Sequence, residues 1–186
     1  LGTAELGIFA ALLYTAMASR VLIGAVGQSA SPRLAKLYEA GDAAAFRRLH
    51  GKLMRFGIAV GLLATAGAAL LGEPFLRLVY GPEYAARNDL FIGMAAVAGV
   101  IHLVSFQGYT VTAARYFRAQ LPVSIAVAAT TLTSAFLLVP RFGAGGAVGA
   151  LLSGALVQGT GYTLLQRHAL RQLEHRATAG KPHAQP

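Results

Sequence analysis

One arginine inside an apolar stretch is the residue whose type and position could do chemistry. Arg20 lies in a long apolar block, and an arginine in hydrocarbon costs roughly 2.5 to 3.5 kcal/mol, so it normally faces a partner or a wet cavity. At helical spacing its face is shared by Ala16, Gly24 and Gly27, whose small side chains indicate an inward-facing surface. A planar guanidinium there would suit a phosphate or diphosphate. The alternative is that Arg20 snorkels to the lipid headgroups.

Three further polar residues fall inside apolar stretches and are candidates for the same binding site. Gln28 follows the arginine by one to two helical turns and could line the same path, and Gln158 lies in the last apolar block. Either glutamine could instead form a simple interhelical hydrogen bond. His102 shares a helical face with Ser105 and Tyr109 and could carry a proton in a coupled transporter. Without a neighbouring carboxylate, it is more often hydrogen-bonded between helices.

The sequence lacks the patterns that enzymes use. It contains no GxxxxGK, HExxH or GxSxG pattern and no clustered carboxylates, so we expect no catalytic residue, no bound metal and no cofactor. It also contains no cysteine, which excludes disulfides and thiolate chemistry. The chain is therefore expected not to be an enzyme, and its substrate-binding candidates are Arg20, Gln28, His102 and Gln158.

The composition indicates that these residues are positioned by helices in a membrane. Hydrophobic residues make up 55% of the chain, charged residues 12%, and the mean hydropathy is +0.56, which is too apolar for an ordinary soluble domain. The net charge of +9 could suggest a nucleic-acid partner. However, the Lys and Arg residues lie mostly in short loops beside apolar blocks, as in membrane proteins, so no nucleic-acid binding is expected.

The apolar blocks predict an all-α, polytopic bundle of about five transmembrane helices, each near the length of a bilayer crossing. They occupy about 6–30, 53–71, 89–109, 120–139 and 144–165. Pro32 is expected to stop the first helix, and a cytoplasmic connector, 33–52, follows with an N-cap at Asp42. Residues 1–166 thus form one transmembrane lobe, and 167–186 a cytoplasmic tail that is expected to be disordered.

Small residues at four-residue spacing predict where helices pack closely. Gly57 and Gly61 form one such pair, and Gly145, Gly149 and Ser153 form a stripe on the last helix. Without large side chains, these faces let the backbone of another helix approach.

The distribution of basic residues predicts the orientation in the membrane. Three lie on one side of the predicted bundle: Arg77, Arg87 and Arg141. Twelve lie on the other: Arg33, Lys36, Arg47, Arg48, Lys52, Arg55, Arg115, Arg118, Arg167, Arg171, Arg176 and Lys181. The side with twelve should be cytoplasmic and carry the C-terminus.

Three stretches carry a family resemblance. The first covers 6–49, with Gln28 and Pro32-Arg33-Leu34-Ala35-Lys36-Leu37-Tyr38; the second is Gly72-Glu73-Pro74-Phe75-Leu76-Arg77-Leu78-Val79-Tyr80-Gly81-Pro82-Glu83-Tyr84; the third is Pro140-Arg141-Phe142-Gly143. Together they resemble the polysaccharide-repeat-unit flippases, the O-antigen type, Wzx-like branch of the multidrug/oligosaccharidyl-lipid/polysaccharide exporter superfamily. The resemblance covers nearly the whole chain.

This resemblance implies two lobes that face a central cavity, with the chain forming most of the C-terminal lobe. Such proteins move undecaprenyl-diphosphate-linked oligosaccharides from the cytoplasmic to the periplasmic leaflet of the bacterial inner membrane, and cavity arginines hold the diphosphate. Arg20 is the position that matches this role. The chain begins with Leu1 rather than Met, so we expect a missing N-terminal lobe as a partner, together with the lipid-linked oligosaccharide and membrane lipids.

Two other functions remain open from sequence. A drug or organic-cation antiporter of the same superfamily would favour acidic residues inside the membrane, and the interior of the later spans contains none. A non-transporting membrane scaffold for glycan assembly would not need Arg20 but would need the packing stripe around Gly145 and Gly149.

Overall fold

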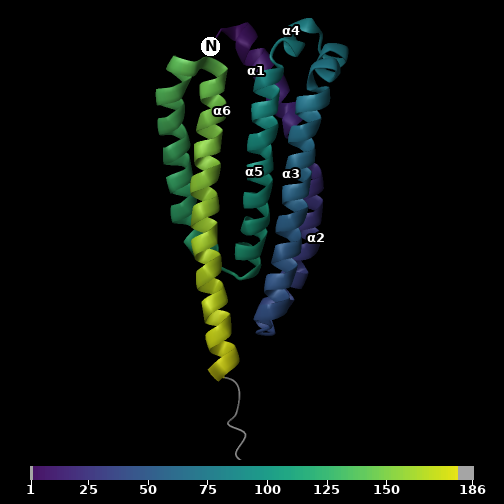
Figure 1. The fold of residues 1–186 in the computed structure, drawn as a ribbon. Coiled ribbons are helices and arrows are strands. Elements are labelled where there is room, and N and C mark those ends of the chain that lie inside the picture. The colour runs from purple at the N-terminus through teal and green to yellow at the C-terminus, as the bar shows by residue number, and fades with distance from the viewer. Residues whose placement is uncertain (1, 180–186) are drawn as a thin grey trace, which may run out of the picture.

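The computed structural model describes residues 2–179, and within this range the chain is helical without any strand. The helices are α1 (Thr3–Ala16), α2 (Arg20–Glu39), α3 (Ala43–Val79), α4 (Pro82–Ala85), α5 (Asn88–Ala113) and α6 (Phe117–Ala179). Except for the inclined α1 and the short α4, they run roughly along one common direction (Figure 1). This confirms the all-α bundle predicted from the apolar blocks.

Three of the described helices, α3, α5 and α6, are long and apolar enough to cross a membrane, and the bent α1–α2 pair makes a fourth candidate. The 63-residue α6 is itself a hairpin, because Gly143 has non-helical backbone angles (φ 57°, ψ −132°). We call 117–142 the outgoing arm and 144–179 the return arm. With these two arms counted separately, the described bundle contains the five segments that the sequence predicts.

Contacts between the two arms of α6 show that they run antiparallel. The hydroxyls of Ser153 and Ser134 are 2.9 Å apart. A Cβ added to Gly149 would lie 3.3 Å from the Leu138 side chain, so the predicted stripe packs against the outgoing arm at these two positions. Gly145 has nothing within 4 Å of such a Cβ, so the stripe does not extend to it.

The first predicted helix is broken. Instead of running unbroken over 6–30, the chain bends by 40° between α1 and α2, and in the turn the N–H of Arg20 donates to Met17 O (2.9 Å). The helix also continues beyond Pro32, where the sequence placed its end. A proline removes one backbone hydrogen bond, and the burial of Leu34 and Tyr38 in the core offsets this loss by holding the last turns of α2 in place.

α3 is a single helix of 37 residues, which corrects the predicted connector 33–52 and span 53–71. Its start agrees with the prediction, because the Asp42 carboxylate accepts a hydrogen bond from the Ala45 N–H (2.8 Å). It passes through Pro74 because Gly72 and Leu76, on either side of the proline, are buried.

The predicted disordered tail is helical over its described part. The return arm continues through 167–179, because Ala169 and Leu173 on this segment are buried in the core. Residues 180–186 lie outside the described range.

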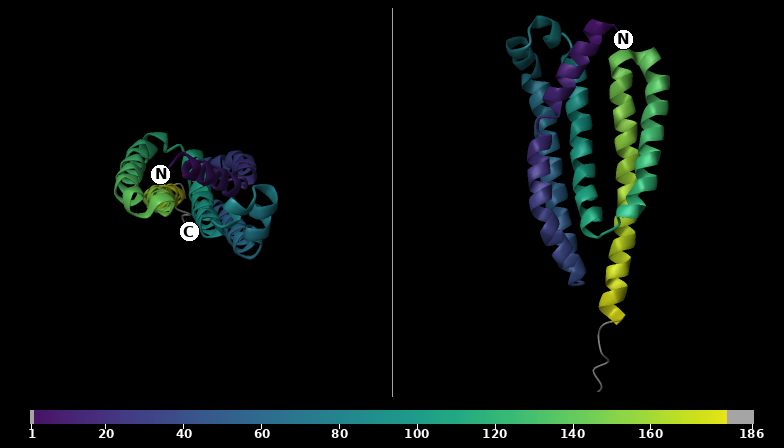
Figure 2. Two further views of the ribbon diagram at one scale, coloured as in Figure 1. Left: turned by 90° about the horizontal axis from the view of Figure 1, so that it is seen from above. Right: turned by 180° about the vertical axis from the view of Figure 1, so that it is seen from behind.

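α5 is the central helix, and α2, α3 and α6 all pack against it. Figure 2 shows this from above and from behind, with α5 between the α1–α2 pair and the α6 hairpin. The backbones of α3 and α5 approach closely, because a Cβ on Gly61 would lie 2.9 Å from the Cα of Gly99. One on Gly57 would lie 3.1 Å from Phe106. Both glycines therefore make the close packing predicted from their spacing.

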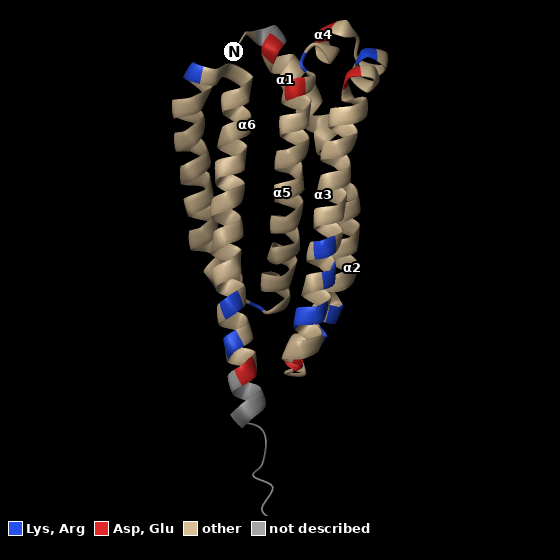
Figure 3. Cartoon of the chain, viewed as in Figure 1, with Lys and Arg blue, Asp and Glu red and all other residues tan. Residues whose placement is uncertain are grey.

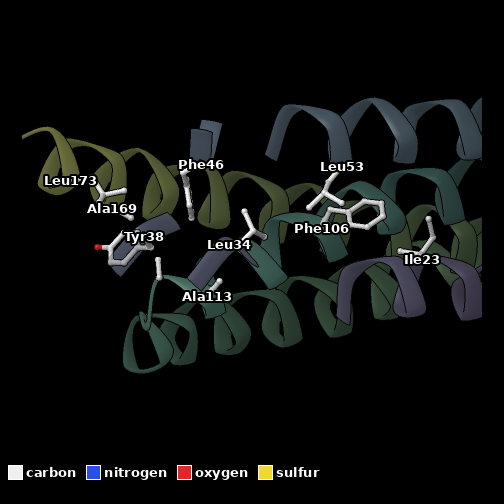
Figure 4. Packing of buried hydrophobic residues seen from close by; sticks show 10 residues of the cluster. Ile23, Leu34, Tyr38, Phe46, Leu53, Phe106, Ala113, Ala169 and Leu173 are labelled. Carbon is white, nitrogen blue, oxygen red and sulfur yellow. The ribbon is translucent and has the colours of Figure 1, made fainter. Parts of the chain in front are cut away.

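The largest core cluster ties four helices together at one end of the bundle. Figure 4 shows Leu34 of α2, Phe46 of α3, Phe106 of α5 and Leu173 of α6 in this cluster. All four side chains are at most 1% exposed. The return arm is therefore anchored to the other helices at this end.

Lys and Arg residues gather at the same end, where α2 ends, α3 begins and the described part of α6 ends (Figure 3). We call this the basic end. The opposite end carries a mixture of acidic and basic side chains, among them Glu5, Glu73, Arg77 and Arg87. The structure thus places the two sets of loops from the charge count at opposite ends of the bundle.

Candidate functional site

Arg20 is the first residue of α2 and directly follows the break from α1. Its side chain is exposed. Four arginines in the described part of the chain form ion pairs: Arg47 with Glu174, Arg77 with Glu73, Arg87 with Glu5 and Arg115 with Glu39. Arg20 belongs to none of these pairs, so its charge is uncompensated by any described carboxylate.

The break lies near the middle of the bundle, far from either end of α5. Ser19 Oγ is 3.3 Å from His102 Nε2, and His102 is the fifteenth of the 26 residues of α5. At a rise of 1.5 Å per residue, this position is about 21 Å from the start of α5 and about 17 Å from its end. Arg20, next to this break, therefore lies near the middle of α5 and far from both of its ends, which weakens the snorkelling alternative.

The backbone at the break leaves little free hydrogen-bonding capacity. The N–H of Arg20 is taken by Met17 O, and the N–H of Val21 approaches Ala18 O at 3.4 Å. The start of α2 is therefore not an open set of donors for an anion. Any anion at this position would be bound by the Arg20 side chain.

His102 is fully buried against the break. Its Nε2 atom meets Ser19, whereas Nδ1 has no hydrogen-bond partner among the described residues. The charge of Arg20 is near enough to act electrostatically on the imidazole. The predicted common face of His102 and Tyr109 is confirmed, because Tyr109 also meets the α1–α2 pair, where its ring occupies the space that a Cβ on Gly27 would need.

Two of the small residues near Arg20 face the interior of the bundle, as the sequence indicated, and one of them meets a side chain of α5 there. Ala16 and Gly27 are buried, and Gly27 makes room for the Tyr109 ring of α5. The break at 17–19 changes the helical phase between Ala16 and Arg20, whereas Gly27 stays on the face of α2 that carries the exposed Arg20. Gln28 is also exposed. A Cβ added to Gly24 would lie 3.9 Å from Gln28 Nε2 and 4.0 Å from the Tyr109 hydroxyl, so both side chains lie beside Gly24.

The structure does not bring Gln158 into this group. The Gln158 amide donates to the hydroxyl of Tyr162 on its own helix (3.3 Å), and Tyr162 packs with Val104 and Val111 of α5. Gln158 thus belongs to the α5–α6 interface. Arg20, His102 and Gln28, by contrast, all lie along the contact of α5 with the α1–α2 pair.

Two features of the described chain were missed by sequence reasoning. One is the break itself, for which the only signal was Ser19, a residue type favoured at helix starts. The other is a cavity of about 430 Å³ between α3, α5 and the return arm. The signal for this cavity in the sequence was Gln107, a polar residue within the predicted span 89–109. The Gln107 amide donates a hydrogen bond to the Thr163 hydroxyl (3.0 Å). No group of three or more His, Asp or Glu residues in the described range could hold a metal ion.

The fold defines an all-helical, polytopic bundle with helices able to span a membrane. The chain is similar to the capsular polysaccharide biosynthesis protein CapF of Staphylococcus aureus, with 28% identity over 143 residues. The matched region covers 76% of this chain and 36% of CapF, so the chain spans about a third of the length of this relative. No protein family model and no solved structure matches the chain.

Proposed function

We propose that this chain acts in polysaccharide biosynthesis as the C-terminal lobe of a flippase. Its cargo would be an undecaprenyl-diphosphate-linked oligosaccharide, moved from the cytoplasmic to the periplasmic leaflet. The similarity to CapF, whose name assigns it to capsular polysaccharide biosynthesis, supports the coarser role. The observation that carries the transport proposal is Arg20, an exposed and unpaired arginine beside a helix break at the middle of the bundle.

The chemistry of the guanidinium suits this cargo. The planar fork of Arg20 can donate two parallel hydrogen bonds to the oxygens of a diphosphate. A charge at this depth needs a partner or water, and no described carboxylate supplies one. A diphosphate that passes through the membrane would pair with Arg20 at the point where its own desolvation is most costly.

The surroundings of Arg20 support a role for this face. Ser19 joins the break to the buried His102, so the position of Arg20 is fixed relative to α5. Gln28 is exposed two turns further along α2 and would offer an amide to the sugar or phosphate oxygens. In the proposed protein, this face would look toward an N-terminal lobe across the transport path.

The proposed location is the bacterial cytoplasmic membrane, with the C-terminus in the cytoplasm. The basic end collects the Lys and Arg residues (Figure 3), and such an excess is typical of cytoplasmic loops. This orientation places the start of α1 at the periplasmic side.

Complementation of a bacterial strain that lacks its own flippase tests the proposal. The full-length gene would be compared with its Arg20→Ala and Arg20→Lys variants at matched membrane expression. Arg33→Ala is the matched control, because Arg33 is an exposed arginine on the same helix but near the basic end. We expect surface glycan with the wild type and Arg33→Ala, a loss of at least about tenfold with Arg20→Ala, and partial recovery with Arg20→Lys, which keeps the charge but loses the fork.

The other outcomes point to the alternative functions. If all variants restore glycan equally, Arg20 is not on a transport path. If substitutions at Gly149 then abolish surface glycan while Arg20→Ala does not, the chain acts as a membrane scaffold and not as a transporter. If the wild type fails in several glycan backgrounds but confers drug resistance, the chain belongs to an antiporter.

A further inference from the structure

A groove that the proposed transport path does not use lies between α3, α5 and the return arm of α6. The cavity has a volume of about 430 Å³, and Figure 1 shows α5 between the two helices that form its walls. It is lined by Met54, Val100, Leu103, Val104, Gln107, Ala155, Leu156, Gly159, Thr160, Thr163, Leu164 and Arg167. Most of these side chains are apolar, and Arg167 is the only charged one.

The polar groups inside the groove are already hydrogen-bonded. Gln107 donates to Thr163 (3.0 Å), Thr163 donates to the Gly159 carbonyl (2.8 Å), and Thr160 donates to the Leu156 carbonyl (2.8 Å). The Oε1 atom of Gln107 has no described partner but is covered by protein. The groove therefore offers a ligand a mainly apolar surface along its length.

Two arginines stand at the basic end of the groove. Arg167 and Arg171 are both exposed and lie one turn apart on the return arm, where like charges repel each other. Neither belongs to an ion pair in the described part of the chain. Glu174, on the same face of this arm, pairs with Arg47 of α3 instead. The two guanidiniums thus form a positive site that would be stabilised by an anion between them.

The dimensions fit one leaflet of a bilayer. From Ala155 to Arg167 the return arm rises by about 18 Å at 1.5 Å per residue, compared with about 15 Å for half of the hydrocarbon core. Leu156 and Leu164, at the rim, are 56% and 61% exposed, so the groove is accessible from the side along its length. Arg167 lies two residues beyond the predicted span 144–165, where headgroup phosphates would lie.

We propose that this groove binds an anionic phospholipid of the leaflet at the basic end. One acyl chain lies along α5, and the phosphodiester is held by Arg167 and Arg171, whose forks match phosphate oxygens. Basic pockets between transmembrane helices are suited to anionic headgroups. The site is separate from Arg20, which lies on α2, so the proposal does not rest on the proposed transport function.

A tryptophan reporter tests the site, because the chain contains no tryptophan of its own. Leu164→Trp places a tryptophan at the rim of the groove, and we call it the groove reporter. Leu132→Trp places one on the outgoing arm, at an exposed position outside the groove (71%), and we call it the control reporter. The protein would be reconstituted in phosphatidylcholine vesicles. One series would contain increasing fractions of phosphatidylglycerol with brominated acyl chains, and the other would contain increasing fractions of phosphatidylcholine with brominated acyl chains, because bromine quenches tryptophan fluorescence.

We expect half-maximal quenching of the groove reporter with about fivefold less brominated phosphatidylglycerol than brominated phosphatidylcholine, since each arginine near the surface adds attraction for an anionic lipid. The control reporter should be quenched equally by both lipids. Arg167→Gln with Arg171→Gln should remove the preference at the groove reporter, whereas Arg118→Gln, an exposed arginine at the same end, should leave it intact.

The proposal is overturned if both lipids quench the groove reporter alike, or if the double variant keeps the preference. Should the double variant fail to fold, the comparison of the two lipids with both arginines present still decides. A preference that is equally large at the control reporter would indicate general attraction to the charged leaflet and would also overturn a specific site.

Discussion

At the scale of single residues, the contact between Ser19 and His102 fixes the position of Arg20. Ser19 Oγ lies in the α1–α2 break and His102 Nε2 lies on α5, 3.3 Å away. Among the described residues, this hydrogen bond between side chains joins the α1–α2 break to the central helix α5. Without this hydrogen bond, only apolar packing would hold Arg20 at its depth in the bundle.

Replacing Ser19 tests the value of this contact. We expect Ser19→Ala to destabilise the protein by about 0.6 kcal/mol, the average for hydrogen bonds between membrane helices. The measurement is thermal unfolding in detergent. Ser29→Ala is the control, because the Ser29 hydroxyl bonds only to the Val26 carbonyl of its own helix; an equal effect at both positions would contradict a specific role for the contact with His102.

Sequence reasoning singled out Arg20 and His102 in this region but did not predict their surroundings. The cost of a charge in hydrocarbon is a property of the residue type, so Arg20 could be singled out from the sequence. The space beside Gly27 depends on a tyrosine far away along the chain, Tyr109, and no local pattern gives that contact. For the same reason Gln158 was grouped with Arg20, whereas it bonds to Tyr162.

At the scale of helices, the crossing of α3 and α5 depends on two facing glycines. A Cβ on Gly61 would lie 2.9 Å from the backbone of Gly99, and a backbone atom cannot rotate away as a side chain can. Larger residues must therefore separate the two helices that form the centre of the bundle.

Gly61→Leu is expected to destabilise the protein by about 1 to 3 kcal/mol, the usual range for overpacking. Gly67→Leu is a matched control on the same helix, because a Cβ there has nothing within 4 Å. Thermal unfolding of both variants in detergent gives the comparison. Equal stability of the two would mean that the close crossing does not determine the packing of α3 on α5.

Helix boundaries were predictable where local chemistry sets them. Asp42 caps α3 as expected, because capping depends on the neighbouring backbone alone. The stops expected at Pro32 and before Pro74 were wrong, because the residues beyond each proline, such as Tyr38 and Leu76, are buried against other helices. Tertiary burial there outweighs the local cost of proline, and a sequence window does not contain that information.

At the scale of the whole molecule, the uneven distribution of charge makes the orientation testable. The chain contains no cysteine, so single cysteines can be introduced without background. Ala44 lies at the basic end, at the start of α3, and Ala86 lies at the opposite end, between α4 and α5; both are exposed.

We expect a membrane-impermeant maleimide to label Ala86→Cys in intact cells but Ala44→Cys only after the cells are opened, because loops rich in Lys and Arg remain in the cytoplasm. Labelling is measured by the shift in gel mobility. The reverse pattern would contradict the proposed orientation, together with the direction of transport that depends on it.

The outgoing arm of α6 has a different environment from the central helix α5. It packs chiefly on the return arm, and Leu121, Ile125, Leu132 and Phe136 are all more than 60% exposed. In a membrane, such side chains meet fluid lipid, which accepts any apolar shape, whereas α5 meets fixed neighbours that accept few. The outgoing arm should therefore diverge faster than α5 among descendants of this gene, keeping its hydrophobicity while losing the identity of its residues.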